Sequence, residues 1–363
     1  AQAVQDAGLA FIGPSPQAIA AMASKTAARA RVAVAGVPLA PGSEGAVTPT
    51  DDVLAIAERI GYPVIVKASE GGGGIGMTIV HDPARLMSAV DRARRSAARA
   101  FGSDEVYLER FLQRARHVEV QVFGDAHGAT IAVGLRECSV QRRHQKVVEE
   151  APAPALSDGT RAALAQAAVR AAQSVDYTNA GTVEFLVGER DEFYFLEMNT
   201  RLQVEHPVTE LTTGLDLVEW QLRVAAGEPL PLAQEQVPLR GHAIEARIYA
   251  EDPHTMLPSP GTITRWRPPT GDHVRLDAGV EEGSVVSPLY DPLLAKLVVW
   301  DEEREGAIRR MEAALEAFTV EGVKTNIPLV RRIMKHAEFV AGRYSTGLIA
   351  SLTEAPSTSP AGA

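Results

Sequence analysis

Residues 197 to 210 read Glu-Met-Asn-Thr-Arg-Leu-Gln-Val-Glu-His-Pro-Val-Thr-Glu, the most informative stretch of this 363-residue chain. The apolar and aromatic segment 193–196 precedes it and is typical of a buried strand. Because side chains alternate along a strand, we expect Glu197, Asn199 and Arg201 on one face. Buried charges need partners. This face therefore holds either a structural salt-bridge network or a ligand with its own charge, such as a metal ion with a phosphate.

A second acidic strand is expected just upstream. Residues 181–186 are apolar except for Glu184, and the turn at 188–191 predicts a hairpin with the strand that ends near Asn199. That hairpin would set Glu184 beside Glu197. Two neighbouring acids without a cation repel each other, and Mg²⁺ prefers carboxylate and amide oxygens together with substrate phosphates. We therefore predict a magnesium–nucleotide site at these three residues.

A glycine run supports this prediction from elsewhere in the chain. Residues 62–67 form a predicted strand ending in Lys67, residues 71–76 read Gly-Gly-Gly-Gly-Ile-Gly, and a second strand follows at 77–80. Consecutive glycines let backbone N–H groups approach phosphate oxygens. A strand follows the glycines, which excludes both a P-loop and a dinucleotide fingerprint. The pattern predicts a flap over phosphates, with a merely flexible loop as the alternative.

Three long segments resemble the biotin carboxylase family of the ATP-grasp superfamily, which includes subunits of acetyl-CoA and propionyl-CoA carboxylases. They are 67–77, 138–152 and 197–210, and the similarity continues through 240–247 and 257–261. It covers the chain from residue 1 to about residue 350. The resemblance implies an α+β fold, an ATP-grasp fold with a small glycine-flap lid domain and a larger C-terminal catalytic domain.

The expected domain layout follows from the same resemblance. Residues 1–39 would be the end of an N-terminal α/β domain with linker helices, 40–112 the lid, and 113–352 the catalytic and C-terminal domain. Residues 353–363 read as a disordered tail or a linker. Because the sequence begins inside a domain, we expect it to be part of a longer chain. The expected elements include a strand at 9–12, helices within 15–36 and at 51–60, 83–100, 158–175 and 306–318, and strands at 106–109 and 117–122.

The resemblance also implies a reaction. MgATP and bicarbonate would form carboxyphosphate, which releases CO₂ beside N1 of biotin on a carrier protein, the first half-reaction of an acyl-CoA carboxylase in fatty-acid synthesis. The residues matching the family's nucleotide site are Lys25 and Lys67 (phosphates), Gly73 and Gly74 (flap), Glu109, Arg110 and Leu112 (adenine), His117, Gln141 and His144 (ribose and phosphates) and Leu186 (base). Glu184, Glu197 and Asn199 match the metal ligands, for Mg²⁺ with Mn²⁺ as an alternative.

A separate set of residues matches the bicarbonate and biotin chemistry. Lys146, Arg201, Gln203 and Val204 match the bicarbonate pocket. Glu205 matches the base that deprotonates bicarbonate, and Arg247 matches the residue that steadies the biotin enolate. His206 is expected to be structural.

Two departures from the family leave alternatives open. Ile75 stands where the family usually carries Lys or Arg in the flap, and most of the N-terminal domain is absent from the sequence. The alternatives are another ATP-grasp ligase, of the carbamoyl-phosphate type or from purine synthesis, and a catalytically silent scaffold that keeps ATP binding. Arg247 and the stretch 197–210 argue against both.

Composition points to a cytoplasmic enzyme. There is no apolar run long enough to span a bilayer, no visible secretory signal, and a single cysteine, Cys138. A net charge of −10 argues against nucleic acid as a partner. The resemblance implies a biotin carrier and a carboxyltransferase as partners, and a homodimer or larger complex. Nothing in these residues names the final acyl-CoA.

Overall fold

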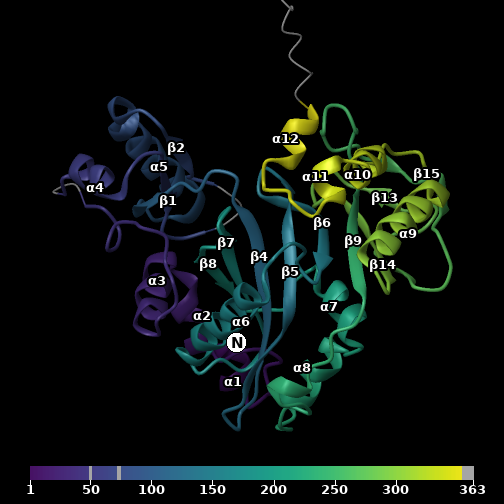
Figure 1. Ribbon diagram of the computed structural model, residues 1–363, viewed down its shortest axis with the longest axis horizontal. Helices are drawn as coiled ribbons and strands as arrows, with labels where there is room; N and C mark the ends of the chain where they lie inside the picture. Colours follow the sequence, from purple (N-terminus) through teal and green to yellow (C-terminus); the bar gives the residue numbers. More distant parts are fainter. Residues whose placement is uncertain (49–50, 72–74, 354–363) are drawn as a thin grey trace, which may run out of the picture. The chain divides into compact units, whose positions relative to one another are not determined.

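The computed structural model describes residues 1–48, 51–71 and 75–353, and the chain divides into two compact units (Figure 1). The first unit comprises Ala1–Leu135, Leu156–His206 and Thr213–Pro238, and the second comprises Arg136–Ala155, Pro207–Thr212 and the chain from Leu239 onward. Gly73, Gly74 and the expected tail after residue 353 lie outside the described residues. In the part of the chain that is described, no helix is both long and apolar enough to cross a membrane.

The first unit begins with helices rather than with a strand. Its N-terminal helices are α1 (Gln2–Asp6), α2 (Pro16–Ala23) and α3 (Lys25–Val34). Ser15 and Ser24 cap α2 and α3 with their side-chain oxygens, as serine commonly does at helix starts. The strand expected at 9–12 is wrong, because no described strand pairs with it and Leu9 is 65 % exposed. Apolar composition alone cannot satisfy a strand's backbone groups.

The lid part of the first unit is a three-stranded antiparallel sheet with two helices. The order is β2-β1-β3, with β1 (Val64–Ala68), β2 (Thr78–Val80) and β3 (Val106–Arg110), so the expected strand–glycine–strand hairpin is confirmed. The helical elements are α4 (Val53–Ile60), the short 3₁₀ helix η1 (Pro83–Arg85) and α5 (Leu86–Phe101). Val64, Val66 and Leu108 pack with both helices in one apolar core. Lys67 and Glu109 therefore lie on the other face of this sheet, since strand side chains alternate.

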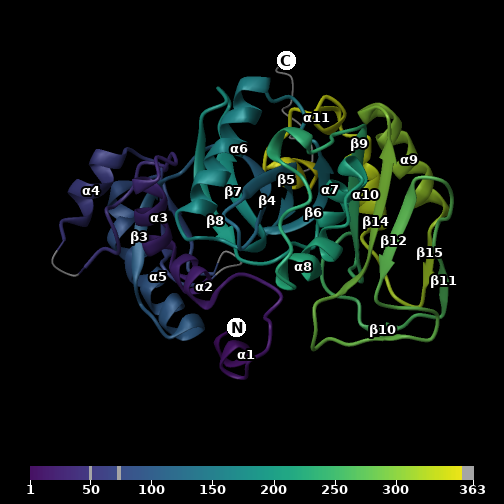
Figure 2. The same cartoon turned by 90° about the horizontal axis from the view of Figure 1, so that it is seen from below.

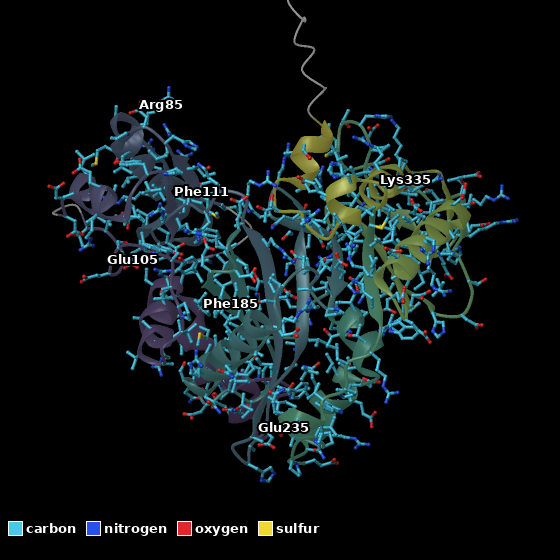
Figure 3. The ribbon with its side chains drawn as sticks, in the orientation of Figure 1. Arg85, Glu105, Phe111, Phe185, Glu235 and Lys335 are labelled. Carbon is cyan, nitrogen blue, oxygen red and sulfur yellow. The ribbon has the colours of Figure 1, made fainter. Side chains whose placement is uncertain are left out.

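The larger part of the first unit carries the acidic hairpin. Strand β7 (Asn179–Val187) pairs antiparallel with β4 (Arg116–Gly124) on one side and with β8 (Phe193–Asn199) on the other. Phe185, labelled in Figure 3, is fully buried and makes edge-on ring contacts with Phe193 and Phe195. The remaining elements that lie wholly or partly in this unit are β5 (Thr130–Arg142), α6 (Asp158–Gln173), α7 (His206–Thr213), α8 (Leu217–Ala225) and η2 (Gln234–Gln236).

The second unit is built on strands in the order β12-β14-β9-β6, followed by the end of β5. Their bounds are β6 Gln145–Ala151, β9 His242–Tyr249, β12 Val274–Ala278 and β14 Leu293–Asp301, and the short strands are β10 Gly261–Thr262, β11 Arg265–Arg267, β13 Val285–Val286 and β15 Thr319–Glu321. Helices α9 (Arg304–Ala317) and α10 (Ile327–Met334) pack on β9 and β14 around one apolar core (Figure 2). The chain continues through α11 (Ala337–Val340) and α12 (Leu348–Thr353).

Candidate active site

The two acids of the β7–β8 hairpin lie directly opposite each other, as the sequence predicts. Glu184 is the register partner of Glu197, and a bulge follows between Glu184 and Phe185. Asn199 Nδ2 donates a hydrogen bond of 3.0 Å to Glu184 Oε1, and Gln203 Nε2 donates one of 2.9 Å to the same oxygen. The hairpin therefore brings two carboxylates and two amides together at one strand end.

Strand β4 adds a third acid that the sequence reasoning missed. Glu119 is fully buried and stands opposite Glu184 in the β4–β7 ladder. His117 is on the same strand, and its Nε2 lies 2.9 Å from Glu184 Oε2. The signal was present in the sequence, because His117, Glu119 and Gln121 alternate with valines and so share one face of the strand.

These side chains fit a divalent cation. His117, Glu119 and Glu184 each offer one ligand atom, and the three atoms lie within 4.8 Å of one another. Glu197 adds a further carboxylate from β8. Glu119 and Glu184 are buried, whereas Glu197 is partly exposed and pairs with Lys25. Oxygen-rich sites of this kind suit Mg²⁺ bound together with phosphate groups.

The two lysines predicted to hold phosphates lie in the first unit, in different environments. Lys67 is buried and forms an ion pair with Glu109, which also pairs with Arg29. Lys25 Nζ lies 3.4 Å from Glu197 Oε2 and also donates to the backbone oxygen of Gly71 at the start of the glycine run. Lys25 therefore connects the acidic hairpin to the base of the predicted flap.

The turn after β8 presents the residues expected to handle bicarbonate. Arg201 donates to Gln203 Oε1 at 3.3 Å and to Asn199 Oδ1 at 3.4 Å. Glu205 is completely buried just before α7 begins. His206 Nδ1 lies 2.8 Å from the backbone oxygen of Gln203, which agrees with the expected structural role of this histidine. Val204 is half-buried in the same turn.

The other predicted nucleotide contacts of the first unit lie on β3, β4 and β7. Glu109 and Arg110 end β3, the first buried and the second exposed, and Leu112 follows them half-buried. Leu186 is half-buried on β7 and stands opposite His117. Ile75 is 49 % exposed.

Four predicted site residues belong to the second unit. Gln141 and Lys146 face each other across the β5–β6 hairpin, and His144 lies in its turn with a φ of 66°. Arg247 on β9 donates from Nε to Glu149 Oε1 at 2.6 Å, and Glu149 is fully buried. Fixed by this carboxylate, the guanidinium is held in one orientation.

Tyr249 links the lysine and the arginine of this second set. Its hydroxyl donates a hydrogen bond of 3.3 Å to the backbone oxygen of Lys146, two residues along β9 from Arg247. Burial raises the pKa of Tyr249 to about 12, so the hydroxyl stays protonated near neutral pH.

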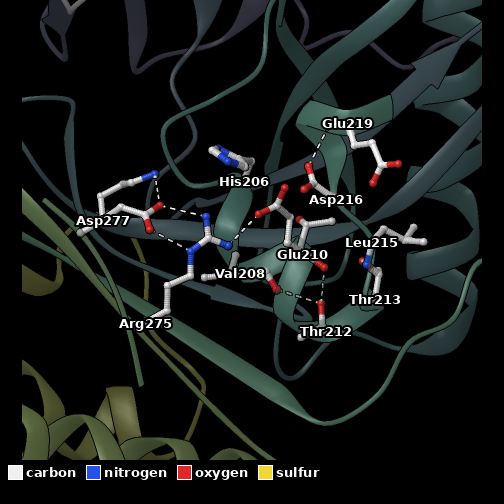
Figure 4. A network of polar contacts seen from close by, with 12 residues as sticks. His206, Val208, Glu210, Thr212, Thr213, Leu215, Asp216, Glu219, Arg275 and Asp277 are labelled. Carbon is white, nitrogen blue, oxygen red and sulfur yellow. Dashed lines mark hydrogen bonds and ion pairs between the residues drawn. The ribbon is translucent and has the colours of Figure 1, made fainter. Parts of the chain in front are cut away.

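The segment at 197–210 ends in an ion pair with β12. Glu210 on α7 accepts a hydrogen bond of 2.7 Å from Arg275 Nη1, while Arg275 also holds Asp277 (Figure 4). Lys296 lies 3.1 Å from Asp277 on the next strand. This partly exposed network attaches the middle of α7 to β12 within the second unit.

Comparison with known proteins agrees with this geometry. Residues 24–233 match the family described as the carbamoyl-phosphate synthase L chain, ATP binding domain, and residues 245–351 match the biotin carboxylase C-terminal domain. The chain is 50 % identical over 349 residues to a biotin carboxylase of Halalkalibacterium halodurans, covering 96 % of this chain and 77 % of that protein. It is 51 % identical over 352 residues to the mitochondrial methylcrotonoyl-CoA carboxylase subunit alpha of Arabidopsis thaliana, of which it spans 48 %.

A solved structure extends the similarity to the whole fold. The biotin carboxylase domain dimer of 2-oxoglutarate carboxylase from Hydrogenobacter thermophilus, in complex with MgADP, ADP and bicarbonate, aligns with a TM-score of 0.94 at 43 % identity. The alignment covers 97 % of this chain and 78 % of that one. The fold and site thus define an ATP-dependent ligase with the ATP-grasp fold. Within that class, the chain belongs to the biotin carboxylase family.

Proposed function

We propose that this chain carries out the MgATP- and bicarbonate-dependent carboxylation of biotin on a carrier protein. The observation that carries the proposal is the facing pair Glu184 and Glu197, with buried Glu205 a few residues further along the chain. A metal and nucleotide site would thus be directly followed by a candidate base. The 2-oxoglutarate carboxylase domain in complex with MgADP and bicarbonate supports this reading.

The nucleotide phosphates would be held by two lysines. Lys67 projects from the non-core face of the lid sheet, and Lys25 lies at the base of the glycine run. We assign Glu184, Glu197 and Asn199 to the metal, with Glu119 and His117 as additional candidates. The bound metal would screen the phosphate charges during phosphoryl transfer, where positioning and electrostatics supply most of the catalysis.

Bicarbonate would be bound and deprotonated at the turn after β8. Arg201 would bind the anion through its guanidinium. The side-chain oxygen of Gln203 accepts a hydrogen bond from that guanidinium and so fixes its position. The carboxylate of Glu205 would take the proton, so that a bicarbonate oxygen attacks the γ-phosphorus, carboxyphosphate forms and ADP leaves. Glu205 is completely buried, which restricts the orientations that its carboxylate can take.

Biotin chemistry would fall to residues of the second unit. Glu149 holds the guanidinium of Arg247, which can then stabilise negative charge as the biotin N1 proton is lost. Lys146 supplies a second cation on the neighbouring strand β6. Carboxyphosphate would break down to CO₂ and phosphate, the phosphate would take the N1 proton, and N1 would then form a bond to the carbon of CO₂.

The wider setting is a further part of the proposal. A biotin carrier and a carboxyltransferase would be the partners, in a homodimer or larger complex in the cytoplasm. Relatives include a methylcrotonoyl-CoA carboxylase subunit and a 2-oxoglutarate carboxylase domain, so the acceptor varies within the family. We propose an acyl-CoA acceptor, with acetyl-CoA and fatty-acid synthesis to be tested first.

Phosphate release with and without bicarbonate and free biotin tests the proposal. We expect ATP hydrolysis to require bicarbonate and to be stimulated by biotin. ATP binding without any bicarbonate-dependent hydrolysis would favour the silent scaffold instead. Hydrolysis stimulated by ammonia or another nucleophile, and not by biotin, would indicate a different ATP-grasp ligase.

A further inference from the structure

Helix α5 of the lid carries a row of arginines that the proposed reaction does not use. Arg92, Arg95 and Arg99 are three and four residues apart and so lie along one face of the helix. The buried stripe of the same helix is formed by different residues, which are Leu86, Ala89, Val90, Ala93 and Ala97. All three arginines are exposed. They therefore make a basic surface and not part of the lid core.

This basic surface borders a hollow of about 670 Å³. Its lining includes the three arginines and the Ser96 hydroxyl from α5, and Gly76 to Thr78 from the C-terminal arm of the glycine run. The hollow is open to solvent, and its volume is large enough for a small ligand. We call it the lid groove.

The charge in the lid groove is not balanced by neighbouring protein groups. Within residues 1–48, 51–71 and 75–353, the guanidinium groups of Arg92, Arg95 and Arg99 form no ion pair or hydrogen bond. Arg94 on the adjacent face differs, because its Nη2 donates to the backbone oxygen of Val47 at 2.6 Å. Three close cations that lack acceptors repel each other, in a chain whose net charge is −10. A bound anion would remove this repulsion.

We propose that the lid groove binds a polyphosphate anion at a site separate from the nucleotide site. From Arg92 to Arg99 the helix advances by about 10 Å, which exceeds the size of a single phosphate and suits two or three linked phosphates. Guanidinium groups form paired hydrogen bonds with phosphate oxygens, and Ser96 adds a hydroxyl donor. The ligand class is thus a linear polyphosphate, either inorganic or as the tail of a nucleotide.

The groove is mechanically connected to the glycine run. Gly76 has a φ of +76°, and a Cβ placed there would lie 3.3 Å from Ala68 Cβ and 3.7 Å from the backbone oxygen of Ala93 on α5. The arm from Gly76 to Thr78 therefore packs directly on the helix that carries the arginines. A ligand touching both would restrain this arm, and so, resting on the proposed function, would change the affinity of the flap for ATP.

Titration calorimetry with inorganic tripolyphosphate in saturating MgADP tests the site, because MgADP then occupies the nucleotide site. We expect one binding event in the wild type, weakened at least tenfold in the Arg95→Gln/Arg99→Gln variant. The matched control is Arg309→Gln/Arg331→Gln, which removes two exposed arginines from α9 and α10 and should bind as the wild type does. The proposal would be overturned by any of three results. The Arg95/Arg99 variant could bind tripolyphosphate as tightly as the wild type, the control could lose as much affinity as that variant, or the wild type could show no binding at physiological salt.

A second experiment distinguishes inorganic polyphosphate from a nucleotide tail as the ligand. It also distinguishes failure of the lid-groove proposal from failure of the proposed function. Tripolyphosphate and ATP, titrated in the same MgADP background, should bind with similar affinity if only the phosphate chain is recognised; binding of ATP alone would overturn recognition of the phosphate chain. Because the Arg95/Arg99 variant keeps every residue assigned to the reaction, its ATPase should remain bicarbonate-dependent. If the wild type shows no bicarbonate-dependent ATPase, the proposed function is contradicted. The calorimetric measurement of tripolyphosphate binding to the lid groove is independent of that result.

Discussion

Buried carboxylates occur in both units of this protein, and their surroundings differ. Glu150 in the second unit accepts hydrogen bonds from Arg304 at 2.7 and 2.9 Å, from the Tyr344 hydroxyl at 2.5 Å, and has His242 Nε2 at 2.5 Å. In the first unit, Glu184 is held by Asn199, Gln203 and His117, and it faces a second acid, Glu197.

We propose that this difference separates a structural acid, Glu150, from an acid that serves the reaction, Glu184. Burial alone would raise the pKa of Glu150, but hydrogen bonds from His242 and Arg304 outweigh it and lower the pKa to about 2. The carboxylate of Glu150 on β6 is thus bound by His242 of β9 and by Arg304 of α9, and it joins these three elements. At the β7–β8 hairpin, amide and imidazole groups contact Glu184 and Lys25 pairs with Glu197, and we propose that these acids serve a bound cation rather than the fold.

The largest effect is expected from Glu205→Gln in the first unit. Removing the base should lower bicarbonate-dependent ATP hydrolysis by about 10³-fold, or about 4 kcal/mol of barrier, because amides cannot accept the bicarbonate proton. The control is Glu219→Gln on α8, which removes an exposed acid paired with Arg223. Retained hydrolysis in Glu205→Gln would exclude this residue as the base.

Glu150→Ala should show the reverse pattern. Losing one partner of a buried ion pair leaves the other charges uncompensated, so unfolding free energy should fall by about 3 kcal/mol or more. ATP affinity of the folded fraction should be unchanged. Asp277→Ala is the control, since its pairs with Arg275 and Lys296 are partly exposed and should be worth less than about 1 kcal/mol. Denaturant unfolding measures both; similar losses in the two variants would contradict a special role for Glu150.

Glu197→Gln tests whether the acids of the β7–β8 hairpin bind a metal, in contrast to the structural Glu150. We expect the Mg²⁺ concentration for half-maximal ATPase to rise about tenfold or more, because a metal carboxylate is lost. The melting temperature should stay constant or rise, since the facing acids no longer repel and the pair with Lys25 is partly exposed. Glu189→Gln, in the turn of the same hairpin, is the control. A marked fall in stability with unchanged Mg²⁺ dependence would make Glu197 a structural acid.

The facing of the two hairpin acids could be predicted because its information is local, whereas most other site residues were assigned through the family resemblance. The turn at 188–191 and strand alternation fixed the facing of Glu184 and Glu197, which the register confirms. Glu119 was missed because its position depends on β4 pairing with β7, some sixty residues later in the chain. The expected strand at 9–12 shows the opposite error, since local apolar character was present and a pairing partner among the described residues was not.

Long-range pairs in the second unit explain the rest. Arg247 was assigned through resemblance, but the acid that holds it, Glu149, is 98 residues away and follows no local pattern. The same is true of Glu150 and Arg304, which are 154 residues apart. In the sequence, Glu149 and Glu150 are adjacent and look equivalent. The two acids point to opposite faces of β6, because side chains alternate along a strand. Glu149 therefore pairs with Arg247, and Glu150 pairs with Arg304.

The smallest effect is expected in the pH dependence of stability. Because the folded-state pKa of Glu150 is lowered from 4.5 to about 2, its contribution is complete above the unfolded pKa and is lost as the pH falls through this window. Between pH 6 and pH 3.5 the wild type should lose about 1 kcal/mol more than Glu150→Gln, which has no carboxyl group to protonate. Urea unfolding of both proteins at several pH values measures the difference. Parallel curves down to pH 3.5 would mean that Glu150 keeps an ordinary pKa, and the contrast between the two buried acids would then rest on geometry alone.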